Sequence, residues 1–130
     1  MKTSNMKILV VDDSPTMRRM VISSLRELRN VHFEEASNGL EAVEQLAVGH
    51  LKQAPVNLII LDLNMPDIHG LEVLKFVRSY EFYSSIPVIV LTTRSDAATR
   101  NEALAAGASS YMTKPFEPQT LIAQANSFLN

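Results

Sequence analysis

Short apolar runs alternate with longer stretches of mixed polarity along the whole chain. Five runs rich in β-branched residues cover roughly residues 6–11, 31–36, 56–62, 86–92 and 109–113, and such runs are typical of β-strands. The stretches between them repeat apolar residues every three or four positions, which predicts amphipathic helices. Strands that alternate with helices, and are themselves apolar nearly throughout, favour a parallel sheet covered on both faces.

The expected helices have recognisable ends. Ser14 is a ready N-cap with Pro15 at the first helical position. Asn38, three residues before Glu41, resembles a capping box, and Gly49 is expected to close that second helix. An alanine-rich helix over about 96–106 ends at Gly107, and the last helix opens near 117–118. The apolar stripes are Met17, Met20, Val21, Leu25 and Leu28; Leu40, Val43, Leu46 and Ala47; Leu71, Leu74 and Val77; and Leu121, Ile122, Ala125, Phe128 and Leu129.

Length and composition restrict the class of protein. A chain of 130 residues has room for one domain, expected over 1–130. The net charge of −2 and the lack of a basic run argue against nucleic acid or an anionic membrane as a partner. Cysteine is absent, no apolar segment reaches the length of a membrane span, and the first five residues lack an apolar signal core. We therefore expect a cytoplasmic protein.

Candidate chemistry gathers where the apolar runs end. Asp12 and Asp13 follow the first run, Asp62 the third, Thr92 ends the fourth and Lys114 follows the fifth. In a parallel sheet these ends meet at one edge, where α/β proteins bind ligands. Crowded carboxylates resist ionisation unless a cation joins them, and Mg²⁺ prefers such oxygen ligands. Three acids, a hydroxyl and a lysine together indicate a phosphoryl site.

Each of these residues also has a purely structural interpretation. Asp13 would suit a helix N-terminus, although Ser14 is the better cap. Asp62 would suit the turn that follows it, and Lys114 would suit an exposed surface. A capping role for Asp62 leaves the other acids and the lysine unexplained, so we prefer the phosphoryl site. The three histidines share no metal-ligand spacing, and the Met17 and Met20 pair is interpreted as core.

The order of these residues resembles response-regulator receiver domains. The resemblance rests on Asp12-Asp13, on Asp62 within the segment 62–70 (DLNMPDIHG), on Thr92 and on Lys114-Pro115, and it covers essentially the entire chain. The Ser14-Pro15 start, Tyr111 three residues before the lysine and the lack of an output domain are most similar to the CheY-like single-domain members that serve chemotaxis. The resemblance implies a flavodoxin-like (CheY-like) three-layer sandwich, with a doubly wound five-stranded parallel sheet in order 2-1-3-4-5.

The resemblance also implies a mechanism. Asp62 would accept a phosphoryl group from a phosphohistidine on a sensor histidine kinase or phosphotransfer protein. Asp13, Asp62 and the backbone carbonyl of Asn64 would hold Mg²⁺, and Asp12 would act through a bound water. Lys114 would pair with a phosphoryl oxygen, and family members carry a cis peptide bond between this lysine and the following proline.

The family further implies a switch and an output surface. Thr92 would donate a hydrogen bond to the phosphoryl group, and Tyr111 would respond by turning its ring. Hydrolysis of the acyl phosphate would depend on Asn64 and Arg94, two positions past the aspartate and the threonine. The downstream protein target would bind the face formed by the fourth helix, the last strand and the last helix.

Other functions fit the sequence less well. A haloacid-dehalogenase-like phosphatase also uses a strand-end aspartate and Mg²⁺, but its acid/base aspartate would fall at Asn64, an amide. A flavodoxin-like cofactor protein needs a hydroxyl- and glycine-rich phosphate loop after the first strand, and residues 12–16 offer none. A receiver that serves a non-chemotactic phosphorelay, or that acts as a phosphate sink, remains an open alternative. The intact acids, threonine and lysine argue against a degenerate receiver used only for binding.

Overall fold

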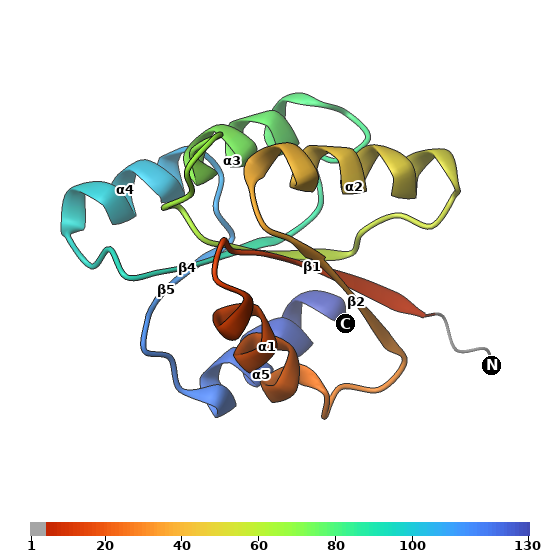
Figure 1. Ribbon diagram of the computed structural model, residues 1–130, viewed down its shortest axis with the longest axis horizontal. Coiled ribbons are helices and arrows are strands. Elements are labelled where there is room, and N and C mark those ends of the chain that lie inside the picture. The colour runs from red at the N-terminus through yellow and green to blue at the C-terminus, as the bar shows by residue number, and fades with distance from the viewer. Residues whose placement is uncertain (1–4) are drawn as a thin grey trace.

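The computed structural model describes residues 5–130. Four of the five N-terminal residues that we expected to lack a signal peptide lie outside the described residues. Five parallel strands form one sheet in the order β2-β1-β3-β4-β5, which confirms the predicted topology. The sheet runs through the middle of the molecule (Figure 1). The strands are β1 (Met6–Val11), β2 (Val31–Ala36), β3 (Leu58–Leu61), β4 (Val88–Thr92) and β5 (Ser110–Thr113).

Helices cover both faces of the sheet and complete a three-layer sandwich. The helices α1 (Pro15–Leu25) and α5 (Pro118–Leu129) lie on one face, drawn below the sheet in Figure 1. The helices α2 (Gly39–Leu51), α3 (Gly70–Ser79) and α4 (Ala97–Ala105) lie on the other face. Every strand therefore ends at the same edge, from which a loop leads into the next helix.

Two hydrophobic clusters form because side chains alternate between the faces of a strand. In β1, Ile8 and Val10 pack with α1 and α5, whereas Leu9 and Val11 pack with α2 and α3. The strands β3 and β4 alternate in the same way, and all three central strands are buried on both faces. Burial on both faces explains why these runs are apolar throughout.

The caps that begin the helices follow the predictions. The Ser14 hydroxyl accepts a hydrogen bond from the Met17 amide at 3.1 Å, and the Asn38 side chain accepts one from the Glu41 amide at 2.8 Å. Glu41 returns the contact one residue earlier than a standard capping box, because its carboxylate accepts from the amide and hydroxyl of Ser37. Both helix starts are thus fixed by local sequence.

Some details of the helices were predicted wrongly. Gly49 does not end α2, which continues to Leu51; a Cβ on Gly49 would lie 2.8 Å from the Ala54 carbonyl oxygen. This glycine therefore permits a close backbone approach, and Gln53, with φ 58°, takes the left-handed conformation after the helix. Leu40 is 54% exposed, since α2 buries Ala42 and Leu46 instead.

The helix α1 is shorter, and its buried face is narrower, than the apolar stripe predicted. It ends at Leu25, so Leu28 lies in the following loop. Met20 is 50% exposed and is not a core residue, because the helix turns Val21, Ile22 and Leu25 toward the sheet.

Across residues 5–130, no helix combines the length and the apolar character that crossing a membrane requires.

Candidate functional site

Three carboxylates meet at the carboxyl edge of the sheet, as the strand ends predicted. Asp12 and Asp13 follow β1, Asp62 follows β3, and one carboxylate oxygen from each lies within 4.8 Å of the other two. Asp12 and Asp62 are each 5% exposed, whereas Asp13 faces solvent. Among the described residues this is the one cluster of acids and histidines with the spacing of a metal site. Its oxygen donors suit a hard cation such as Mg²⁺.

Lys114 joins the acids from the loop after β5. Its ammonium nitrogen lies 2.7 Å from an oxygen of Asp12 and 3.5 Å from an oxygen of Asp62. The Lys114-Pro115 peptide bond is cis, as the family resemblance led us to expect. The lysine side chain is 10% exposed. A cation is thus already held between the two buried carboxylates and offsets part of their repulsion.

The surroundings of Asp62 disfavour the charged form of its carboxyl group. Burial raises the pKa of its carboxyl group and the neighbouring Asp12 raises it further, whereas Lys114 and hydrogen bonds from the Asn64 amide and the Thr92 hydroxyl act in the opposite direction. The Asn64 amide donates to an Asp62 oxygen at 3.3 Å. Burial outweighs the favourable contacts. Such a poised, incompletely compensated carboxylate is a frequent property of reactive residues.

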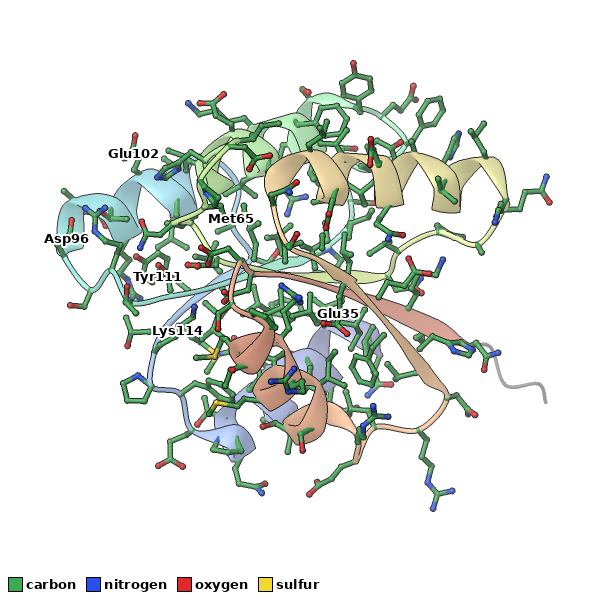
Figure 2. The ribbon with its side chains drawn as sticks, viewed as in Figure 1. Glu35, Met65, Asp96, Glu102, Tyr111 and Lys114 are labelled. Atoms are coloured by element: carbon green, nitrogen blue, oxygen red, sulfur yellow. The ribbon has the colours of Figure 1, made fainter. Side chains whose placement is uncertain are left out.

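Thr92 connects the acid cluster to the surface around Tyr111. Its side chain is fully buried, and its hydroxyl oxygen accepts a hydrogen bond from the Arg94 amide at 3.4 Å. The carbonyl of Arg94 in turn accepts from the Tyr111 hydroxyl at 2.7 Å. The Arg100 guanidinium lies over the tyrosine ring, 5.9 Å from its centroid. Figure 2 shows Tyr111 and Lys114 at the same end of the molecule as Asp96.

The Arg94 side chain is directed to the start of α4. Its guanidinium lies 3.3 Å from Asp96 and donates to the Thr99 hydroxyl at 2.9 Å. Asp96 caps α4 by accepting from the amide and the hydroxyl of Thr99, and these bonds lower the pKa of its carboxyl group to about 2. The structure therefore places Arg94 with the cap of α4, and its backbone links Thr92 to Tyr111.

Two residues that support the acid loops were not predicted from the sequence. Arg18 on α1 binds the carbonyl of Asp12 and the carboxylate of Glu35. Asp67, in the loop after β3, accepts from the amides of Gly39 and Leu40 at the start of α2. Their partners lie 6–28 positions away in sequence. These separations do not match any local sequence motif, and therefore no sequence pattern predicted the two residues.

Two of the three histidines make structural contacts. His69 caps α3 by accepting a hydrogen bond from the Leu71 amide through Nδ1 at 3.2 Å. His50 stacks on Phe82 with ring centroids 4.0 Å apart, at the far end of α2. His69 thus serves as a helix cap and His50 as an aromatic contact.

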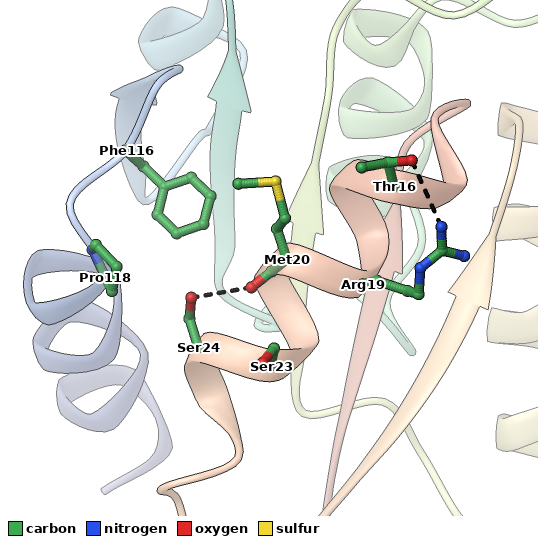
Figure 3. Close-up of a pocket in the computed structure, with 7 residues that line it drawn as sticks. All are labelled: Thr16, Arg19, Met20, Ser23, Ser24, Phe116 and Pro118. Atoms are coloured by element: carbon green, nitrogen blue, oxygen red, sulfur yellow. Dashed lines mark hydrogen bonds between the residues drawn. The ribbon is translucent and has the colours of Figure 1, made fainter.

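A surface groove of about 470 Å³ lies between α1 and the start of α5 (Figure 3). Exposed Met20 lines it opposite Phe116 and Pro118, and Ser24 donates a hydrogen bond to the Met20 carbonyl. None of the clustered acids lines this groove. It is therefore distinct from the acid cluster.

Comparison with known proteins defines the class. The family model described as response regulator receiver domain matches residues 8–126. The chain therefore belongs to the response regulator receiver family, whose members act as phosphorelay switches together with histidine kinases or phosphotransfer proteins.

Within this family the chain resembles CheY chemotaxis response regulators. It is 43% identical over 116 residues to a chemotaxis protein CheY homolog of Campylobacter jejuni, covering 89% of this chain and 86% of the relative. Chemotaxis protein CheY1 of Helicobacter pylori is also 43% identical, with 89% and 90% covered. The structure of Vibrio cholerae CheY4 superposes with a TM-score of 0.81 at 34% identity, over 96% of this chain and 99% of that one.

Proposed function

We propose that this chain is a stand-alone response regulator, a single receiver domain over 1–130, with Asp62 as its phosphoacceptor. A carboxylate oxygen of Asp62 attacks the phosphorus of a phosphohistidine on a sensor histidine kinase or phosphotransfer protein. The new oxygen–phosphorus bond forms as the phosphorus–nitrogen bond breaks, and the imidazole of the donor keeps the electron pair. The observation that carries this proposal is the cluster of three carboxylates at one sheet edge, with Lys114 in contact with Asp12 and Asp62.

The acids fit Mg²⁺. In this proposal Asp13, Asp62 and the backbone carbonyl of Asn64 hold the ion directly, and Asp12 holds it through a water molecule. When bound, the ion neutralises charge on the phosphoryl and carboxylate oxygens as they approach. Asp13 is exposed and would hold the ion from the solvent side, whereas Asp62 is buried.

Lys114 and Thr92 complete the phosphoryl site. Lys114 is a compact point charge that already contacts Asp12 and Asp62, so it can pair with a phosphoryl oxygen on Asp62 after a small movement. The Thr92 hydroxyl is a hydrogen-bond donor beside the same carboxylate. Both residues stabilise the acyl phosphate rather than take part in bond breaking.

The acyl phosphate then decays by slow hydrolysis, so the protein acts as a switch and not as a turnover enzyme for a metabolite. Asn64 positions water near the phosphorus. Arg94 stands at the second position that tunes this rate in the family. Its guanidinium is held by Asp96 and Thr99, and this basic residue in place of an acidic one favours slower or partner-dependent hydrolysis.

The signal leaves through the face built from α4, β5 and α5. Tyr111 lies on β5, and its contacts with Arg94 and Arg100 couple it to the loop before α4 and to α4 itself. The relatives from Campylobacter and Helicobacter are named as chemotaxis proteins, so we propose a chemotaxis target, in the cytoplasm. A non-chemotactic phosphorelay or a phosphate sink is the alternative.

Labelling with a small phosphodonor tests this assignment. Acetyl phosphate should phosphorylate the wild-type protein in the presence of Mg²⁺ and not in excess chelator. Asp62→Asn should abolish the label, whereas the matched control Asp96→Asn should be labelled like the wild type because Asp96 lies outside the cluster. A label that survives Asp62→Asn, or that forms equally in chelator, would contradict the proposed phosphoacceptor.

A further inference from the structure

Every polar group of Asp12 has a partner, and the partners come from different parts of the fold. Its amide donates to the Ala36 carbonyl at the end of β2 at 3.0 Å. One carboxylate oxygen accepts from the Ser14 amide at 2.9 Å, and the other accepts from Lys114 at 2.7 Å. Its carbonyl oxygen accepts from Arg18 at 2.5 Å. Asp12 is therefore fixed on all sides.

Arg18 makes this last contact while it is itself anchored. Its Nε donates to a carboxylate oxygen of Glu35 at 2.7 Å, and its Nη1 donates to the Asp12 carbonyl. The arginine side chain is 13% exposed. Figure 2 shows Glu35 between the sheet and α1. A single planar guanidinium thus joins α1, β2 and the loop that carries two of the three acids.

We propose that Arg18 is a positioning residue for the cation site, a role that rests on the proposed function of the acid cluster. The carbonyl of Asp12 belongs to the peptide group that leads to Asp13. A hydrogen bond to this carbonyl fixes the orientation of that peptide plane and hence the direction in which exposed Asp13 leaves the backbone. Arg18 thereby holds the acids at the spacing that Mg²⁺ needs.

The bridging geometry distinguishes this role from a simple ion pair. An ion pair with a half-exposed carboxylate contributes little by itself, and the Glu35 side chain is 47% exposed. Two different nitrogens of Arg18 serve two acceptors, which a rigid guanidinium does well. A lysine at this position keeps the charge, but its single ammonium on a flexible stem does not reproduce the fork.

The sign of the expected effect separates positioning from electrostatics. Removal of a positive charge near an acid cluster would by itself strengthen the binding of a cation. Loss of positioning would weaken it. Weaker binding of Mg²⁺ after removal of Arg18 therefore reports the positioning role directly.

The experiment measures the Mg²⁺ dissociation constant of the unphosphorylated protein by amide NMR titration. We expect Arg18→Ala and Arg18→Lys each to weaken Mg²⁺ binding by about tenfold, as is typical when a partner of a ligand loop is lost. Arg19→Ala is the matched control, because Arg19 is the next residue on α1, is exposed, and contacts Thr16 at 3.5 Å. It should stay within about twofold of the wild type, since surface charges away from a site have small effects.

Three results would overturn the inference. They are unchanged or tighter binding in Arg18→Ala, rescue by Arg18→Lys, and an equal loss in Arg19→Ala. If Arg18→Ala does not fold, Arg18→Lys together with Glu35→Ala, which removes the anchor alone, gives the same decision. Asp13→Asn tests the proposed function separately: if it leaves Mg²⁺ affinity unchanged, the acid cluster is not the cation site, whatever the Arg18 variants show.

Discussion

Asp62 and Asp96 both follow strands at the carboxyl edge of the sheet, yet their surroundings shift their pKa values in opposite directions. Asp62 is 5% exposed, and burial raises the pKa of its carboxyl group. Asp96 is exposed, and hydrogen bonds from the hydroxyl and amide of Thr99 lower the pKa of its carboxyl group to about 2. One carboxylate opposes folding at neutral pH and the other supports it.

This difference in pKa distinguishes Asp62, a candidate reactive residue, from Asp96, which caps a helix. Asp96 is paired with Thr99 and Arg94 and has little free capacity for a ligand. Asp62 is surrounded by charges that only partly compensate it. A ligand cation can offset the burial cost of Asp62 that its present contacts only partly compensate, so Asp62 gains more from a cation than Asp96 does.

The largest expected effect concerns Thr92, which joins the two regions. Thr92→Ala removes the hydroxyl that accepts from the Arg94 amide and lies beside Asp62. The variant should still be phosphorylated at Asp62, but it should lose about five- to a hundredfold of the coupling to its target, the usual range for allosteric coupling. The measurement is target affinity with and without a beryllofluoride phosphoryl mimic.

The Tyr111 ring provides the internal control for this variant. Its NMR signals should change with the mimic in the wild type. The reason is that two hydrogen bonds connect the Thr92 hydroxyl to the Arg94 amide, and the Arg94 carbonyl to the Tyr111 hydroxyl. The change should be lost in Thr92→Ala. A wild-type ring that ignores the mimic would show that Tyr111 is structural and that the signal leaves by another route.

The next effect is a gain in stability from Asp62→Asn. The folded state binds the Asp62 proton more tightly than the unfolded state, so this group costs stability as pH rises from the unfolded pKa of 3.8 through the raised folded pKa. Without metal, the variant should therefore be more stable than the wild type at pH 7 and unfold at a higher Tm. Thermal unfolding from pH 3 to 7 measures it, and the difference should shrink toward pH 3.

A smaller effect is expected for Arg94, the residue that contacts Asp96. Arg94→Glu replaces its contact with Asp96 by a repulsion and frees the side chain at the second rate-tuning position. Dephosphorylation should change by a few-fold, about 1 kcal/mol or less in barrier, while Mg²⁺ affinity stays nearly constant. The decay of labelled protein after removal of the phosphodonor gives the rate, and an unchanged rate would remove Arg94 from the hydrolytic mechanism.

The smallest effect is expected for Asp96→Asn. Asparagine is also a good N-cap, so α4 should persist. The wild-type carboxylate contributes stability above its unfolded pKa of 3.8, and this contribution is lost as pH falls through about 2. The wild type should therefore be slightly more stable at pH 5, with the difference lost as the pH falls from 3.8 to about 2, opposite to the trend for Asp62→Asn. Parallel pH profiles for both variants would contradict the contrast between the two aspartates.

The sequence was sufficient for the order of elements and for most of the acid site. The runs identified all five strands. The three central strands are apolar because both of their faces are buried, whereas the edge strands β2 and β5 are partly exposed. The runs overestimated β3 and β4 by a few residues, since strand ends depend on where pairing stops. Asp12, Asp13, Asp62, Thr92 and Lys114 were located because parallel strands end together.

Contacts between distant segments were decided by the tertiary structure alone. The exposure of Met20 and Leu40 depends on how far each helix is rotated against the sheet, which an apolar stripe does not specify. Gly49 is an interior helix residue because the Ala54 backbone packs against it. The support of Asp12 by Arg18, anchored on Glu35 at 2.7 Å, has no local pattern. Hydrophobic periodicity reports which residues are buried, but the partners of a polar group are set only when the elements pack together.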